Sequence, residues 1–290
     1  MTGGGFSYQF ARFSPAEKLI TINVAVFLVI NLIAFLFGIP NNLLEFWLVL
    51  PDNATDFIFR PWTLVTYSFL HASLWHLFFN MLMLYYVGRI FLNFFSVSQF
   101  YSAYFLGAML GGSFFLLSYS LFPAFAYSNA PLVGASAGVM AILIFICTYL
   151  PNQEVRVLFF NVKLWNVGVF FVILDLAMIP LNNNPGGRIA HLGGALLGYI
   201  YATRLARGSD MGAVFYSLLH RIRGIFIPRQ KKAPLRTVHR SKSQGIKSKH
   251  PEKAAYQQKI DLILDKISTS GYESLTQAEK DFLFKAGKED

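Results

Sequence analysis

Three short polar motifs interrupt the apolar segments of this chain, and their residue types suit nucleophilic catalysis. His76 and Asn80 lie four residues apart, so in a helix both side chains leave from one face. Ser136 lies within the small-residue sequence Gly134–Gly138, and His191 opens a later apolar segment. A serine hydroxyl is a poor nucleophile at neutral pH, and an adjacent histidine base activates it. Brought together by the fold, these residues could carry out acyl transfer.

The first two motifs also have structural interpretations. The His76–Asn80 pair could bond a neighbouring helix or a loop, although polar residues inside a membrane favour a function because burying them unpaired is costly. The small residues around Ser136 are also what close helix packing needs. As a nucleophile at a helix N-terminus, Ser136 would lie where unpaired backbone N–H groups and the helix dipole stabilise an oxyanion.

The sequence around His191 indicates close helix packing. Ala190, Gly194 and Gly198 recur every four residues and predict a smooth stripe that packs against another helix. His191 lies beside this stripe. Close approach of the two helices could therefore bring its imidazole to Ser136.

The composition indicates that these motifs belong to a membrane protein with several spans. Hydrophobic residues make up 54% of the 290 residues and charged residues 14%, against roughly a quarter charged in soluble domains. Such a composition excludes a disordered chain, a collagen-like repeat and a disulfide scaffold. The single cysteine, Cys147, has no partner for an internal disulfide bond.

A helix needs about 20 apolar residues to cross the hydrocarbon core of a membrane. Six apolar runs are predicted to do so. The predicted spans are about Leu19–Phe37, His76–Phe95, Gln99–Phe122, Ser136–Leu150, Val162–Ile179 and Ile189–Leu205. The first is too long for a cleavable signal peptide, and no small-residue cleavage site follows it.

Lys and Arg residues near the span ends predict that both termini are cytoplasmic. With six spans, the second, fourth and sixth then run in the same direction. Their N-terminal ends carry His76 and Asn80, Ser136, and His191. The topology therefore predicts that all three motifs lie at one depth, a few residues below the outer surface.

Taken in order on these three spans, the motifs resemble those of the rhomboid family of intramembrane serine proteases. In this sequence they read His76-x-x-x-Asn80, Gly134-x-Ser136 and Ala190-His191-x-Gly193-Gly194-x-x-x-Gly198. The resemblance covers roughly residues 15–206. It implies an all-α polytopic membrane protein with a six-transmembrane-helix bundle, and a serine-type endopeptidase that cuts transmembrane segments.

The resemblance also implies roles for single residues. Ser136 would attack the scissile carbonyl, and His191 would take its proton and later deliver it to the leaving amine. The oxyanion would be held by the Ser136 backbone N–H with the side chains of His76 and Asn80. This dyad includes no catalytic acid, and it needs no metal and no organic cofactor. The expected partners are single-span membrane protein substrates and the lipid bilayer, and no nucleic acid is expected. The sequence does not determine the oligomeric state.

Several other positions are interpreted in the same light. His71 is expected to support the first loop as a structural residue. Ala137 and Met140 stand where the family often has Gly and Tyr, so substrate preference and histidine orientation are left open. The turn-rich sequence Asn182–Gly187 is expected to form a mobile cap over the active site.

Asp175 lies near the outer end of the fifth span and could be read as a third catalytic residue. The family pattern has no acid at this place, and Arg188 or water could pair with the carboxylate. We therefore expect no catalytic role for Asp175.

The C-terminal part of the chain is basic. Lys and Arg outnumber Asp and Glu by 17 to 9 in residues 206–290, against 8 to 6 in residues 1–205. A basic segment directly after a hydrophobic helix is typical of a cytoplasmic tail attracted to anionic lipid.

Three domains are expected. Residues 1–206 form the six-helix transmembrane protease domain, residues 207–252 an amphipathic juxtamembrane helix with a basic linker, and residues 253–290 a small C-terminal helical hairpin. The function of the tail cannot be read from its sequence.

Two functions compete with proteolysis. A catalytically silent rhomboid-like protein that binds membrane clients typically lacks the serine or the histidine, and this chain has both. A small-molecule transporter is disfavoured because the polar residues gather near one surface, without an inverted repeat or a site at the membrane midplane. The outer-facing site and the lack of an organelle transit signal favour a bacterial inner membrane.

Overall fold

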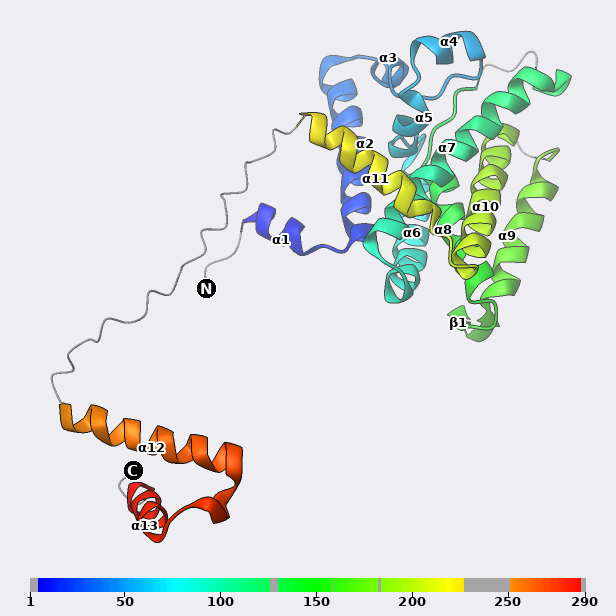
Figure 1. The fold of residues 1–290 in the computed structure, drawn as a ribbon. Coiled ribbons are helices and arrows are strands. Elements are labelled where there is room, and N and C mark those ends of the chain that lie inside the picture. Colours follow the sequence, from blue (N-terminus) through cyan, green and yellow to red (C-terminus); the bar gives the residue numbers. More distant parts are fainter. Residues whose placement is uncertain (1–4, 126–129, 158, 182–183, 227–250, 288–290) are drawn as a thin grey trace. The chain divides into compact units, whose positions relative to one another are not determined.

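The fold is given by a computed structural model, which describes residues 5–125, 130–157, 159–181, 184–226 and 251–287 (Figure 1). The described residues are mostly helical. The chain divides into two compact units, Met1–Pro228 and Arg229–Asp290.

The first unit is built around a bundle of helices (Figure 1). These are α2 (Pro15–Phe37), α6 (Leu74–Phe94), α7 (Val97–Leu121), α8 (Ser136–Tyr149), α9 (Leu164–Met178) and α10 (Pro185–Ala206). Helices α2, α6 and α7 are long and apolar enough to cross a membrane. Helices α8 and α9 are shorter apolar helices of 14 and 15 residues. By length and composition alone, the described residues thus contain three candidate spans.

The described part of the chain is not all helical. A two-stranded antiparallel sheet, β1 (Glu154–Val157) and β2 (Phe160–Lys163), joins α8 to α9. It corrects both the all-α prediction and the predicted start of the fifth span at Val162. The four-residue strands lie at one end of the bundle, and α4 (Ala54–Phe59) lies at the other (Figure 1).

Side chains at the helix starts explain where several helices begin. Ser14 and Ser96 form capping boxes with Glu17 and Gln99, which satisfy backbone N–H groups that have no partner within the helix. Asn184 caps α10 by accepting a hydrogen bond of 2.9 Å from the Gly187 N–H, and Pro185 follows as the first helical residue.

Helix α8 forms the centre of the bundle, since it contacts α6, α7, α9 and α10 and buries nearly all its residues. The closest approach is between α8 and α10. A Cβ added to Gly194 would collide with the carbonyl oxygen of Ala137, and a Cβ added to Gly198 would collide with that of Ala141. The predicted small-residue stripe on α10 is therefore confirmed, with α8 as the helix that it packs against.

The segment between α2 and α6 contains short helices. They are α3 (Asn41–Glu45), α4, α5 (Thr63–Thr66) and the 3-10 turn η1 (Tyr67–Phe69). Backbone hydrogen bonds hold the loop before α8 to this segment at two places. Leu50 and Leu132 exchange backbone hydrogen bonds of 3.2 and 2.9 Å, and the Tyr67 carbonyl accepts a hydrogen bond of 3.0 Å from the Gly134 N–H.

Helix α11 (Met211–Phe226) covers the region where the sequence predicts an amphipathic helix, and it contacts α7. Asp210 fixes its start. This carboxylate accepts hydrogen bonds from the Tyr201 hydroxyl at 2.7 Å, the Gln99 amide at 2.9 Å and the Gly212 N–H at 2.8 Å. The predicted basic linker falls on residues 227–250, which lie outside the described residues. The remaining elements of this unit are α1 (Phe6–Arg12) and the 3-10 turn η2 (Pro123–Phe125).

The second unit consists of α12 (Pro251–Ser270), the 3-10 turn η3 (Tyr272–Ser274) and α13 (Gln277–Ala286). Thr276 begins α13 in a capping box with Glu279. Glu279 also accepts a hydrogen bond of 2.9 Å from Lys266 of α12, which lowers the pKa of its carboxyl to about 2. This contact ties the two helices together.

Candidate active site

One cavity of about 330 Å³ brings the sequence-predicted residues together from four helices. Its polar and charged lining residues are His76 and Asn80 of α6, Ser136 of α8, Asp175 of α9, and Arg188 and His191 of α10. The rest of the lining is apolar and includes Met140. The same cavity is thus lined by all four predicted site residues, His76, Asn80, Ser136 and His191.

Ser136 is the first residue of α8, and the loop before it has a special backbone. Gly134 has a φ of +129°, a conformation that favours glycine. A Cβ added there would lie 2.9 Å from His76 Nε2 and 3.5 Å from the Ser136 hydroxyl oxygen. Gly134 therefore marks the place where the imidazole of α6 and the hydroxyl of α8 come closest to the loop.

His76 and Asn80 lie one turn apart on α6 and have different surroundings. His76 is half-buried, and Asn80 is buried. The Asn80 amide donates a hydrogen bond of 2.9 Å to the His76 backbone carbonyl, which uses one of its two N–H groups. The ring of His71 packs edge-on against that of His76, with centroids 5.1 Å apart. His71 is thus buried behind the cavity, as a structural residue would be.

The imidazole of His191 is held by a buried carboxylate. Its Nδ1 lies 3.1 Å from both oxygens of Asp175, and the Arg188 guanidinium donates a hydrogen bond of 2.8 Å to Oδ1 of the same group. The Asp175 side chain is only 3% exposed. Sequence reasoning foresaw the pairing with Arg188 but not the contact with His191.

Ser136 and His191 line the same cavity without a hydrogen bond to each other, and none to the Ser136 hydroxyl is present in the described parts of the chain. Such a spacing is common before a substrate is bound, because catalytic hydrogen bonds often tighten only in the complex. What the arrangement offers is a hydroxyl nucleophile at a helix start, an oriented imidazole and two further polar side chains.

Two other expectations at the site have different outcomes. Met140 lines the cavity, where its thioether side chain faces the same space as His191. The predicted cap Asn182–Gly187 is wrong for its described part. Asn184 is the N-cap of α10, and Pro185 to Gly187 form its first turn, because Asn followed by Pro is a helix-start signal. Residues 182–183 lie outside the described residues.

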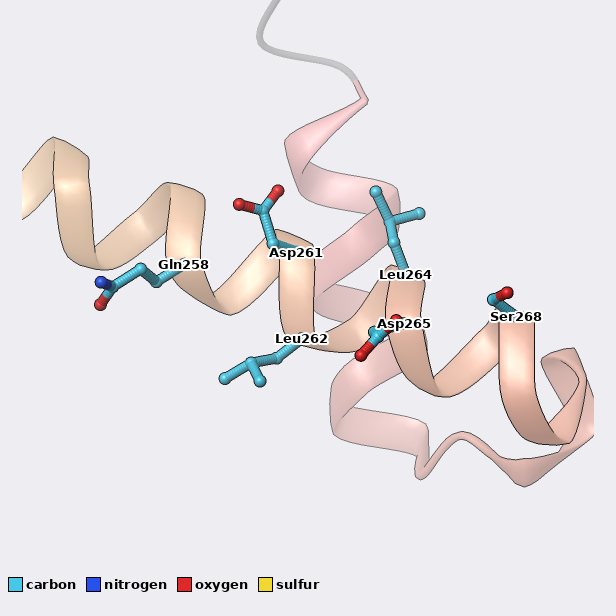
Figure 2. A pocket seen from close by; sticks show the side chains of 6 residues that line it. All are labelled: Gln258, Asp261, Leu262, Leu264, Asp265 and Ser268. Atoms are coloured by element: carbon cyan, nitrogen blue, oxygen red, sulfur yellow. The ribbon is translucent and has the colours of Figure 1, made fainter. Parts of the chain in front are cut away.

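A second hollow, of about 690 Å³, lies on the C-terminal unit. Figure 2 shows its six lining residues, which all come from α12 and include the carboxylates of Asp261 and Asp265. It has no histidine or cysteine beside its single serine, Ser268. Across the described residues of both units, no group of three His, Cys, Asp or Glu side chains could hold a metal ion. The cavity at Ser136 is therefore the candidate active site.

Comparison with known proteins finds a match over the part of the chain that contains the candidate active site. A family model described as a rhomboid domain matches residues 59–208, which is more than half of the 290 residues. Residues 250–286, which contain α12 and α13, match a second model, described as a family of unknown function.

Three curated relatives show how distant the similarity is. RHOMBOID-like protein 12, mitochondrial, of Arabidopsis thaliana is 29% identical over 51% of this chain and 48% of its own length. Rhomboid protein 1, mitochondrial, of Saccharomyces cerevisiae is 26% identical over 66% of this chain and 53% of its own. Presenilin-associated rhomboid-like protein, mitochondrial, of Homo sapiens is 28% identical over 52% and 39%. The chain thus spans about half or less of the length of these relatives.

The relatives correct one prediction from the sequence. All three carry the word mitochondrial in their names. The prediction of a bacterial inner membrane with both termini in the cytoplasm is therefore wrong. The prediction rested on an outer-facing site and on the lack of a recognisable organelle transit signal, and neither of these identifies the membrane.

Proposed function

The chain belongs to the rhomboid family, and from this premise we propose that it is an intramembrane serine endopeptidase. One observation carries the proposal: Ser136, His191, His76 and Asn80, which come from three helices, line a single cavity. The family match by itself would be compatible with a silent relative. The presence of a nucleophile and a base in one space favours an enzyme.

The reaction would proceed by acyl transfer. His191 removes the hydroxyl proton of Ser136 as the Ser136 oxygen attacks the scissile carbonyl carbon. The tetrahedral intermediate collapses when His191 delivers that proton to the leaving amine. A water molecule, activated by the same imidazole, then hydrolyses the acyl-enzyme and frees the serine.

The oxyanion would be stabilised from two helices. The backbone N–H of Ser136 lies in the first turn of α8, where N–H groups have no partner within the helix. The His76 imidazole lies near the same loop at Gly134, and Asn80 retains one amide N–H beyond its bond to the His76 carbonyl. Each such donor is worth on the order of 3 kcal/mol in serine hydrolases.

The proposed substrates are transmembrane segments of single-span membrane proteins. We assign the six-span protease domain to residues 1–206, with α8, α9 and α10 crossing the membrane beside α2, α6 and α7. Residues 207–252 and 253–290 form the juxtamembrane part and the helical hairpin. The relatives' names favour a mitochondrial membrane for the protein.

Labelling by a serine-directed fluorophosphonate tests the proposal on the full chain in mild detergent. Wild type, Ser136→Ala and His191→Ala would be compared, with cleavage of a generic single-span substrate measured in parallel. We expect labelling and cleavage in wild type and the loss of both in the two variants. Ser113→Ala is the matched control, because Ser113 is also half-buried but bonds the Met109 carbonyl within α7.

A folded wild-type protein that neither labels nor cleaves would contradict the proposal. It would favour the client-binding alternative, for which Ser136→Ala leaves binding unchanged. Cleavage that survives Ser136→Ala would place the nucleophile elsewhere.

A further inference from the structure

We propose that Asp175 is a positioning residue, which holds the His191 imidazole as the Nδ1-protonated base that activates Ser136. The inference rests on the proposed protease function and adds a third residue to its Ser–His pair. It reverses the expectation from sequence that Asp175 has no part in the reaction.

The geometry of the contact is the first argument. Both Asp175 oxygens lie 3.1 Å from His191 Nδ1, so the carboxylate straddles this nitrogen. A carboxylate only accepts hydrogen bonds, so Nδ1 must carry the proton when the ring is neutral. Nε2 is then the unprotonated nitrogen, and this is the nitrogen that can accept the Ser136 proton.

The second argument is that charge balance alone does not require the contact with His191. A buried carboxylate needs a compensating partner, and Arg188 supplies one through Oδ1 at 2.8 Å. Both carboxylate oxygens, Oδ2 and the Oδ1 that Arg188 contacts, face the imidazole of His191 and not a second cation. The Asp175 side chain therefore does more than complete an ion pair.

Among the described residues, only Asp175 is hydrogen-bonded to the ring of His191. No aromatic ring stacks on it there, and its other neighbours in the cavity include the flexible side chain of Met140. The charged groups that face it are Asp175 from α9, Arg188 from its own helix, and the ionisable His76 from α6. Of these, Asp175 is the one within hydrogen-bond distance of the ring.

During the reaction the carboxylate would stabilise the imidazolium without taking its proton. The proton moves from Ser136 Oγ to His191 Nε2 and later to the leaving amine, while Nδ1–H remains bonded to Asp175. Arg188 keeps the carboxylate ionised throughout. Asp175 therefore neither gains nor loses a proton, and the proton transfers are the same as for Ser136 and His191 alone.

A test that does not depend on any variant of Asp175 is the tautomer of His191 in the wild-type protein. Nitrogen-15 NMR on histidine-labelled full chain in detergent distinguishes Nδ1–H from Nε2–H. His191→Ala assigns the signal among the six histidines. We expect the Nδ1–H form, and the Nε2–H form would overturn the proposal.

The kinetic test is Asp175→Asn, which keeps the size of the side chain but can donate to Nδ1 and so favours the wrong tautomer. We expect kcat to fall about a hundredfold or more, with KM within about threefold of wild type. Asp175→Glu retains the carboxylate and should keep more activity than Asp175→Asn. Asp210→Asn is the matched control, because it changes another multiply hydrogen-bonded aspartate away from the cavity and should leave kcat near wild type.

The outcomes separate the two proposals. Wild type that cleaves, with Asp175→Asn equally active, would refute the role of Asp175 and leave the protease function standing. Folded wild type without activity would refute the protease function, and the role of Asp175 with it.

Discussion

The carbonyl oxygen of Ala137 occupies the place where a Cβ on Gly194 would have to lie. Ala137 directly follows the proposed nucleophile, and Gly194 is three residues after the proposed base. The backbone contact between α8 and α10 therefore sets how far apart the two reacting side chains can be.

Replacing Gly194 by Ala should separate these helices. Overpacking typically lowers the free energy of unfolding by about 1 to 3 kcal/mol. Because the added Cβ would collide with backbone, we expect a loss of about 3 kcal/mol or more. We expect a lower Tm in detergent and a loss of fluorophosphonate labelling. In Gly287→Ala the added Cβ meets nothing closer than 3.7 Å, so this control should behave like wild type. Unchanged labelling of Gly194→Ala would show that the site tolerates a wider spacing.

The two proposed oxyanion donors of α6 should affect turnover more than binding. We expect His76→Ala and Asn80→Ala each to lower kcat by about 10²- to 10³-fold while KM changes little. Steady-state cleavage of a single-span substrate measures both constants. Phe78→Ala is a control on the same helix, since its side chain is exposed and does not line the cavity. A rise in KM with unchanged kcat would instead assign His76 and Asn80 to substrate binding.

The buried His71 should make the protein sensitive to acid. Burial, reinforced by the neighbouring His76, lowers the pKa of His71 from 6.5 to about 3. The unfolded chain therefore takes up a proton at this residue below pH 6.5, while the folded protein does not. His71 therefore does not reduce the free energy of unfolding above pH 6.5. That free energy should fall by a few kcal/mol as the pH drops from 6.5 toward 4.

His71→Phe should remove that part of the pH dependence. Thermal unfolding in detergent at pH 7.5 and pH 4.5 measures it, with wild type compared at both values. We expect the difference in Tm between the two pH values to shrink in the variant. An equal difference in both proteins would mean that His71 is protonated in the folded state.

Asp210 should control how α11 begins. Burial would raise the pKa of its carboxyl, but hydrogen bonds from Tyr201, Gln99 and the backbone N–H of Gly212 and Ala213 lower it below its ordinary value. The ionised form thus stabilises the fold at neutral pH, and this contribution is lost as the pH falls through the lowered pKa.

Asp210→Asn should loosen α11 by about 1 to 2 kcal/mol, since it replaces a charged acceptor of several hydrogen bonds by a neutral one. Hydrogen exchange of the first turn of α11 measures this directly, and exchange should be faster in the variant. Ser217→Ala removes only an exposed bond to the Val214 carbonyl and should leave the exchange unchanged. Equal protection in Asp210→Asn would mean that the contact of α11 with α7 is sufficient.

The sequence predicts the site better than its surroundings, for a physical reason. The predicted direction of the spans puts His76, Ser136 and His191 at one depth, and the small-residue stripe on α10 predicts a close approach to another helix. These are one-dimensional properties, and periodicity reports them directly. The location of the Ser136 cavity follows from them.

What sequence reasoning missed depends on rotation and on local chain reversal. Whether Asp175 faces His191 is set by the rotation of α9 about its axis, and apart from Asn166 and Asp175 the sequence of this helix is apolar on all sides, so it gives no face to read. The strands β1 and β2 are too short for an alternating pattern to stand out. The start of α10 at Pro185 could have been recognised, because Asn184 before Pro185 is a helix-start signal.

The double attachment of the loop before Ser136 bears on how a substrate is chosen. With Leu132 bonded to Leu50 and Gly134 bonded to Tyr67, this loop cannot shift toward an incoming peptide without breaking backbone pairs. The proposed nucleophile is thus held in place, so the scissile bond of a substrate would have to be carried to it. Selectivity would then reside in the mechanical compliance of the substrate helix, since a stiff helix that cannot unwind by a turn never delivers its carbonyl to Ser136.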